Sequence, residues 1–263
     1  MNLIKYKIKI EYDGLNYAGW QKQPNAKTIQ ETIENALFKY CREKVKVLGC
    51  SRTDAKVHAM AQIAHFEISK DRSVDSILDG LNFYLKDEKI AIKNVEKVDN
   101  LFHSRRCAKG KIYLYKIINR KVPPVLEKDK VWHVKHTIDI DKLKQQSQKL
   151  LGCHNFSAFR GKNCQSKKPI RTLNNIIIDK KKDIITIRFV AKSFLQYQIR
   201  IMTSVLIDVA TGRNIDINWM LKQKDRSTYH KIAPAYGLYL EKIFYSDKIG
   251  MFQSLNNKIP LSL

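Results

Sequence analysis

The sequence has no apolar run long enough to cross a membrane. No stretch approaches the ~18–20 consecutive apolar residues that a membrane-spanning helix requires. Residues 4–12 alternate between apolar and charged side chains, so the amino-terminal part also lacks the unbroken apolar centre of a secretory signal peptide. We therefore expect a cytosolic protein, located in the cytoplasm, with no membrane partner.

Cysteine is scarce, and its spacing excludes the usual cysteine frameworks. The five cysteines are odd in number, contain no Cys-x-x-Cys pair and do not follow the spacing of zinc ligands. Isolated reduced thiols are the expected state. Neither a disulfide-stabilised secreted domain nor a metal-binding module is predicted.

Acidic residues are also few. The 25 Asp and Glu residues stand against 49 Lys and Arg residues, which gives a formal net charge of +24. Such a surplus favours a polyanionic partner, either nucleic acid or an acidic membrane surface. The chain is also rich in Ile and Asn, so a codon bias that inflates Lys is an alternative, as is a plain solvated surface.

The first half of the chain alternates strand-like and helix-like patterns. Residues 4–12 have the period of two that is typical of a half-buried strand. Thr28 and Glu31 form a capping box, and the apolar stripe that follows predicts a helix over residues 29–43. Ser73 caps a second expected helix. Further strands are expected at residues 45–49, 61–68 and 90–98.

The second half repeats this mixture. The expected strands are residues 111–118, 174–179, 183–190 and 238–244, and the expected helices are residues 141–151, residues 198–210 and a short helix that starts at Asp216. No Gly/Ser-rich linker and no repeat separates the halves, which we place at residues 1–105 and 106–263. The pattern predicts an α+β fold in which both halves share one continuous sheet and a ligand-binding cleft lies between them.

One segment concentrates reactive side chains. Cys50–Ala59 (CSRTDAKVHA) places an arginine, a carboxylate and a histidine within seven residues. Glu11–Gly14 and Tyr17–Gln21 precede it, and Gln62–Glu67 follows it. In this order the motifs resemble the tRNA pseudouridine synthase A family, whose nucleophilic aspartate lies in a G-R-T-D-A-G-V-H-A segment. Asp54 falls on that aspartate.

The resemblance implies a fold, a reaction and partners. It implies the pseudouridine synthase fold, in which two ferredoxin-like α+β halves share a continuous, mostly antiparallel sheet with a central cleft. It implies a homodimer that isomerises uridine to pseudouridine in the anticodon stem-loop of tRNA. Because this reaction involves no redox change and no departing group, we expect neither a metal nor an organic cofactor.

Asp54 and Arg200 are the expected nucleophile and its ion-pair partner. Desolvation in a dry cleft raises the pKa of a carboxyl group, and a nearby arginine counteracts this shift. The resemblance supplies Arg200, because Phe194–Arg200 is similar to the family's F-x-x-x-M-V-R-N element, with Ile201 where Asn is usual. The residues alone leave open that Asp54 caps a turn and that Arg200 forms a structural salt bridge.

Tyr113 and Arg52 complete the expected site. Tyr113 matches the family's active-site tyrosine, whose ring can stack on uracil while its hydroxyl handles a proton. Tyr115 lies on the same face of the predicted strand and is an alternative, and a core aromatic is the plain reading of either. Arg52 precedes Asp54 by two residues and matches the family's base-displacing arginine; a phosphate contact is the alternative.

Basic residues near these motifs are expected to contact RNA phosphates. A first strip lies beside Tyr113 and comprises Arg105, Arg106, Lys109 and Lys111. A second strip comprises Arg160, Lys162, Lys167, Lys168 and Arg171. We expect His58 and His65 to be structural.

The motifs depart from the family at Ser51 and Lys56, which replace glycines. Glycine is used where the backbone needs a positive φ or a close approach, so the loop must tolerate a side chain there or be shifted. A non-catalytic tRNA-binding or RNA-folding protein on the same scaffold is therefore the first rival function. A general nucleic-acid-binding module is the second, and a eukaryotic-type relative with other target uridines is the third.

Overall fold

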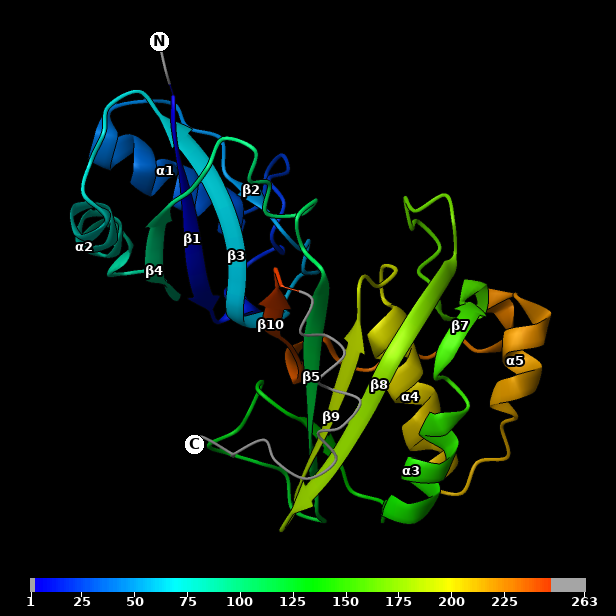
Figure 1. The fold of residues 1–263 in the computed structure, drawn as a ribbon. Helices are drawn as coiled ribbons and strands as arrows, with labels where there is room; N and C mark the ends of the chain where they lie inside the picture. Colours follow the sequence, from blue (N-terminus) through cyan, green and yellow to red (C-terminus); the bar gives the residue numbers. More distant parts are fainter. Residues whose placement is uncertain (1–2, 247–263) are drawn as a thin grey trace. The chain divides into compact units, whose positions relative to one another are not determined.

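The structure is a computed structural model, and it describes residues 3–246. These residues form two compact units, which Figure 1 draws as a ribbon. Of the described residues, the first unit comprises residues 3–108 and 239–245, and the second comprises residues 109–238 and 246. Each unit combines helices with a mostly antiparallel sheet, which confirms the predicted α+β class.

In the first unit, strand β1 is the centre of the sheet. β1 (Ile4–Tyr12) pairs antiparallel with both β3 (His58–Ile68) and β4 (Ile90–Lys97). β10 (Leu238–Phe244) pairs in parallel with the start of β3, and the short β2 (Leu48–Gly49) pairs antiparallel with β3. Helices α1 (Ile29–Cys41) and α2 (Val74–Leu85) pack together and cover one face of this sheet (Figure 1).

The local sequence explains these elements. Tyr6, Ile8, Ile10 and Tyr12 of β1 are buried in alternation with more exposed side chains. The Thr28 hydroxyl accepts a hydrogen bond from the Glu31 N–H and so caps α1, as the capping box predicted. The helix ends two residues before its predicted end, because Arg42 adopts a left-handed conformation with φ of 61°.

In the second unit, β5 (Gly110–Asn119) and β8 (Ile170–Lys181) both pair antiparallel with β9 (Ile184–Ala191). β7 (Gly152–Asn155) pairs antiparallel with β8, and β6 (Trp132–Val134) pairs in parallel with β5. The helices are α3 (Ile140–Gln148), α4 (Gln198–Ala210) and α5 (Ile217–Gln223). α4 is buried along nearly all of its length, and with α3 it covers one face of the sheet (Figure 1).

Short strands account for most differences from the expected elements. β6 was not predicted, and residues 149–151, expected as helix, lie between α3 and β7. β3 begins three residues before its predicted start because His58 and Ala59 pair with β10. Residues 45–47, expected as strand, lack strand pairing. The pairings of β6 with β5 and of β3 with β10 join residues distant in the chain, which local periodicity does not contain.

Candidate active site

The candidate nucleophile lies in the loop between β2 and β3. Ser51 and Thr53 are buried, Arg52 is exposed and Asp54 is half-buried. This alternation agrees with the expectation that residues i and i+2 of an extended segment project to the same side. Arg52 and Asp54 therefore share the outward side of the loop, while Ser51 and Thr53 face the core of the first unit.

The buried side of the loop contacts the end of β1 and the segment that links β1 to α1. The Tyr12 and Thr53 hydroxyls lie 2.7 Å apart in a buried hydrogen bond. The Trp20 N–H donates to the Thr53 carbonyl at 3.0 Å. Gly19 has φ of 101°, and a Cβ there would lie 2.7 Å from the same carbonyl oxygen. Residues 12–20 therefore anchor the buried side of the loop through contacts with Thr53.

The carboxyl-terminal end of the loop is held as well. The Val57 N–H donates to the Asp54 carbonyl at 3.2 Å, which closes a turn. The Gly14 N–H donates to His58 Nδ1 at 3.1 Å, and a Cβ on Gly14 would collide with the Val57 carbonyl. The His58 ring stacks on Tyr239 with a centroid distance of 4.7 Å. These contacts agree with the expected structural role of His58.

The contacts of His65 also agree with the structural role expected for it. Its Nδ1 atom hydrogen-bonds the Ser104 hydroxyl at 3.0 Å. Burial, reinforced by the nearby His103 and Lys5, lowers the pKa of His65 to about 4. His65 is therefore neutral near pH 7.

Lys56 keeps the backbone conformation that a glycine would adopt. Its φ is 65°, in the left-handed region, and its N–H donates to the Tyr17 carbonyl at 3.3 Å. Its side chain is exposed. The loop therefore accommodates a lysine at this position, at a cost of about 1 kcal/mol for a residue other than glycine.

The two tyrosines of β5 have different environments. Tyr115 is fully buried, and its hydroxyl donates to the Pro234 carbonyl at 2.6 Å. Burial raises the pKa of Tyr115 well above its usual value. The ring of Tyr113 meets that of Phe194 edge-on, with centroids 5.4 Å apart. Tyr113 is 8% exposed, so both tyrosines are buried, and a backbone carbonyl holds the hydroxyl of Tyr115.

Arg200 lies in the first turn of α4, six residues after Phe194. Its Nε atom donates to the Ala233 carbonyl at 2.8 Å, and its guanidinium carbon lies 5.1 Å from the centroid of the Tyr197 ring. Tyr197, the residue before α4, has φ of 63°, which is unusual for an aromatic side chain. The orientation of Arg200 is therefore defined by a backbone carbonyl and an aromatic ring.

The structure assigns the expected site residues to different units. Arg52, Asp54 and the exposed Arg105 belong to the first unit. The second unit contains Lys109, Lys111, Tyr113, Arg160, Lys168 and Arg200.

Two arginines of the second basic strip have internal partners. Arg160 donates to the Ser166 carbonyl at 3.5 Å, while Arg171 donates to the Lys168 carbonyl at 2.8 Å and to the Ser166 hydroxyl. These bonds tie together the segment between β7 and β8. The exposed cations of this segment are Lys162, Lys167 and Lys168.

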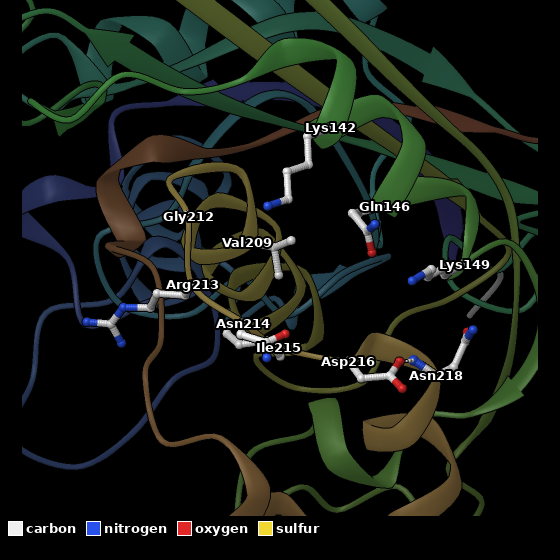
Figure 2. Close-up of a pocket in the computed structure, with 10 residues that line it drawn as sticks. All are labelled: Lys142, Gln146, Lys149, Val209, Gly212, Arg213, Asn214, Ile215, Asp216 and Asn218. Atoms are coloured by element: carbon white, nitrogen blue, oxygen red, sulfur yellow. Dashed lines mark hydrogen bonds between the residues drawn. The ribbon is translucent and has the colours of Figure 1, made fainter.

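The structure also contains a hollow that the sequence did not indicate. It has a volume of about 390 Å³ in the second unit, and its lining residues are drawn in Figure 2. Lys142 and Gln146 of α3 and Lys149, which follows the helix, contribute to it, whereas the Arg213 guanidinium points away (Figure 2). None of the expected site residues lines this hollow.

Two features are absent from residues 3–246. No helix in this range is long and apolar enough to span a membrane. No group of three or more His, Cys, Asp or Glu residues in the same range is arranged to hold a metal ion.

Comparison with known proteins relates the motifs to named relatives. A sequence model of the family described as tRNA pseudouridine synthase matches residues 8–105 and 147–246. The chain is 39% identical over 246 residues to proteins named tRNA pseudouridine synthase A from Brucella ovis and Brucella abortus, covering 92% of this chain and 98% of each relative. A solved structure described as a Cbf5-Nop10-Gar1 complex covers 77% of this chain and 53% of its own, with 12% identity and a TM-score of 0.33, a likeness too weak to bear on the fold.

Proposed function

Because the chain belongs to the tRNA pseudouridine synthase family, and is therefore an isomerase that acts on uridine in tRNA, we propose that Asp54 is the nucleophile of its reaction. The observation that carries this proposal is the geometry of the Asp54 loop. Its buried residues are bonded to the core of the first unit, whereas Asp54 and Arg52 lie on the outward side. A half-buried carboxylate on an anchored loop is suited to attack a bound nucleotide.

The proposed reaction conserves atoms and electrons. The glycosidic bond between N1 of uracil and C1′ of the ribose breaks, the base turns, and a bond between C5 and C1′ forms. The C5 proton leaves and N1 gains a proton, so no oxidant or reductant is needed. Asp54 attacks the sugar or the pyrimidine ring as a carboxylate and is released with the product.

Arg200 and Tyr113 have the supporting roles in this proposal. Arg200 keeps the Asp54 carboxylate ionised, because an adjacent cation lowers the pKa of a carboxyl group. Its fixed Nε bond to Ala233 supports a defined orientation of the guanidinium. Tyr113 stacks on the base and handles the C5 proton. The engagement of the Tyr115 hydroxyl with Pro234 supports this choice between the two tyrosines.

Arg52 and the basic strips recognise the RNA in this proposal. Arg52 displaces the target base from its stack, which a planar guanidinium can do by occupying the vacated space. Its exposure on the same loop as Asp54 supports this role. The exposed lysines of the second strip contact phosphates, and the target is a uridine of the anticodon stem-loop.

We further propose a cytoplasmic homodimer. The loop between β5 and β6 supports self-association, because it exposes Val125 by 82% and Leu126 by 94%. All five cysteines are free thiols, as is usual in a reducing compartment. Light scattering of the purified protein at micromolar concentration measures the number of chains. A mass of one chain that is independent of concentration would contradict the dimer.

The decisive experiment tests Asp54 directly. Purified protein is incubated with unmodified anticodon-arm tRNA, and pseudouridine is scored at each position. We expect the Asp54→Asn variant to lose turnover by at least about 10³-fold, because the amide is not a nucleophile, while tRNA affinity stays within about twofold. Asp79→Asn, which removes an exposed carboxylate on α2, is the matched control and should keep the wild-type rate.

The outcomes separate the rival functions. Binding of tRNA without turnover by the wild type would favour a non-catalytic RNA-binding protein. Equal binding of unrelated RNA would favour a general nucleic-acid-binding module. Turnover at other uridines would leave Asp54 in place and correct the proposed target.

A further inference from the structure

Gln62 of β3 is a buried polar residue whose side chain is bonded to the Asp54 loop. Its exposed fraction is 0%. Its Oε1 atom accepts from the Ser51 N–H at 3.2 Å, and its Nε2 atom donates to the Ser51 carbonyl at 2.7 Å. The carboxamide therefore pairs with both backbone groups of Ser51, as a neighbouring strand would.

This pair fixes the start of the loop. The adjacent Cys50 N–H donates to the Ile63 carbonyl at 2.8 Å, so two successive residues are tied to β3. Thr53, the next buried residue of the loop, is hydrogen-bonded to the Tyr12 hydroxyl and to the Trp20 N–H. The backbone on both sides of Arg52 is thus bonded to the core, and Asp54 follows directly after Thr53.

We propose that Gln62 is a positioning residue for Asp54. This inference rests on the proposed role of Asp54 as nucleophile. Gln62 does not touch the substrate; it holds Ser51, and through the short extended segment it sets where the carboxylate lies. Misplacement of a reacting group by about 1 Å lowers a rate by roughly 10²-fold, so a single backbone anchor can matter strongly.

The chemistry explains why a glutamine suits this position. Ser51 presents one donor and one acceptor, and the neutral carboxamide of Gln62 offers the complementary acceptor and donor at this reach. An asparagine carries the same carboxamide on a stem one methylene shorter, so it does not reach both groups of Ser51. A methionine has a similar shape but leaves both backbone groups without this partner.

The chain offers a matched control in the same unit. Asn82 of α2 makes the same reciprocal pair with Ile92 of β4: its Nδ2 atom donates to the Ile92 carbonyl and its Oδ1 atom accepts from the Ile92 N–H, both at 2.9 Å. This pair ties a helix to a strand and involves no residue of the Asp54 loop. It therefore reports the effect of removing such a pair on folding alone.

The test compares Gln62→Met with Asn82→Leu. We measure single-turnover pseudouridine formation at saturating protein, tRNA affinity by filter binding, and the folded fraction by circular dichroism. For Gln62→Met we expect the rate per folded molecule to fall by about 10- to 100-fold, with affinity within about twofold of wild type. For Asn82→Leu we expect a lower unfolding midpoint and a rate within about twofold.

A second variant covers the case in which Gln62→Met folds poorly. Gln62→Asn keeps the carboxamide but shortens the side chain by one methylene, so that it no longer reaches both backbone groups of Ser51, and the same loss of rate at unchanged affinity is expected. A wild-type rate in the folded fraction of either Gln62 variant overturns the inference, as does an equal loss in Asn82→Leu. If the wild type itself has no turnover, the proposed function fails instead, which distinguishes the two failures.

Discussion

At the residue scale, Lys56 occupies a conformation that glycine adopts more readily. Its φ of 65° is enforced by the bonds on either side, the Lys56 N–H to Tyr17 and the Val57 N–H to Asp54. The Lys56 side chain is exposed and has room, so the strain lies in the backbone alone. The loop keeps its shape because its inward contacts outweigh this local strain.

Replacing Lys56 by glycine should therefore stabilise the protein. We expect Lys56→Gly to raise the free energy of unfolding by up to about 0.5 kcal/mol, the relief of about 1 kcal/mol of strain less the roughly 0.5–1 kcal/mol that the greater freedom of glycine in the unfolded chain costs. Urea denaturation measures this value. Lys56→Ala, which removes the charge but keeps the strain, should leave stability nearly unchanged. An equal gain in both variants would trace the effect to charge and not to the backbone.

At the element scale, β5 places two tyrosines on one face with different surroundings. The Tyr115 hydroxyl bonds Pro234, and the preceding Ala233 carbonyl accepts from Arg200. Tyr113 lies two residues closer to the start of the strand, where its ring meets Phe194. Tyr115 thus anchors the segment after α5, whereas Tyr113 is the phenol that we propose takes part in the reaction.

Removing the hydroxyl of each tyrosine in turn tests these two roles. Tyr115→Phe should lower the free energy of unfolding by about 1 kcal/mol, because the hydrogen bond to the Pro234 carbonyl is lost, and should change the turnover rate by less than about tenfold. Tyr113→Phe should lower turnover by about 10²-fold or more. The two variants are compared by thermal unfolding and single-turnover kinetics. The reverse pattern would assign the reaction to Tyr115.

At the scale of the whole molecule, the net charge of +24 suits a polyanionic substrate. To test whether the location of this charge matters for RNA binding, two clusters of exposed lysines can be compared. One cluster of three, Lys162, Lys167 and Lys168, lies in the segment between β7 and β8. A second cluster of three, Lys180–Lys182, lies at the turn of the β8–β9 hairpin and is also exposed. Replacing either cluster removes the same charge.

Exchanging each cluster for glutamine separates specific binding from general attraction. We expect replacement of Lys162, Lys167 and Lys168 to weaken tRNA binding about tenfold or more. It should also reduce the slope of log affinity against log salt by roughly 0.7–0.9 for each phosphate that the protein no longer neutralises. The matched replacement of Lys180–Lys182 should change affinity by less than about threefold. Equal effects in filter-binding titrations would show that only total charge matters.

Local patterns predicted some elements to the residue and others poorly. α4 and β10 have the predicted bounds, because each carries a clear apolar period. β6 and β7 were not predicted, since strands of three and four residues exist only through their partners. At the candidate site, the motif pointed to Asp54, Arg52 and Tyr113. The paired hydrogen bonds between Gln62 and Ser51 were missed, although Gln62 lies within one of the motifs that surround Asp54.

The amino-acid sequence by itself determined the α+β class, the family and the candidate nucleophile, because these depend on periodicity and on the order of short motifs. Only the tertiary structure decided what the surrounding motif residues do. Tyr12 meets Thr53 across 41 positions of the chain, and Tyr115 meets Pro234 across 119. Hydrogen bonds between such distant residues form only when the sheets bring their strands together, so no local pattern contains them.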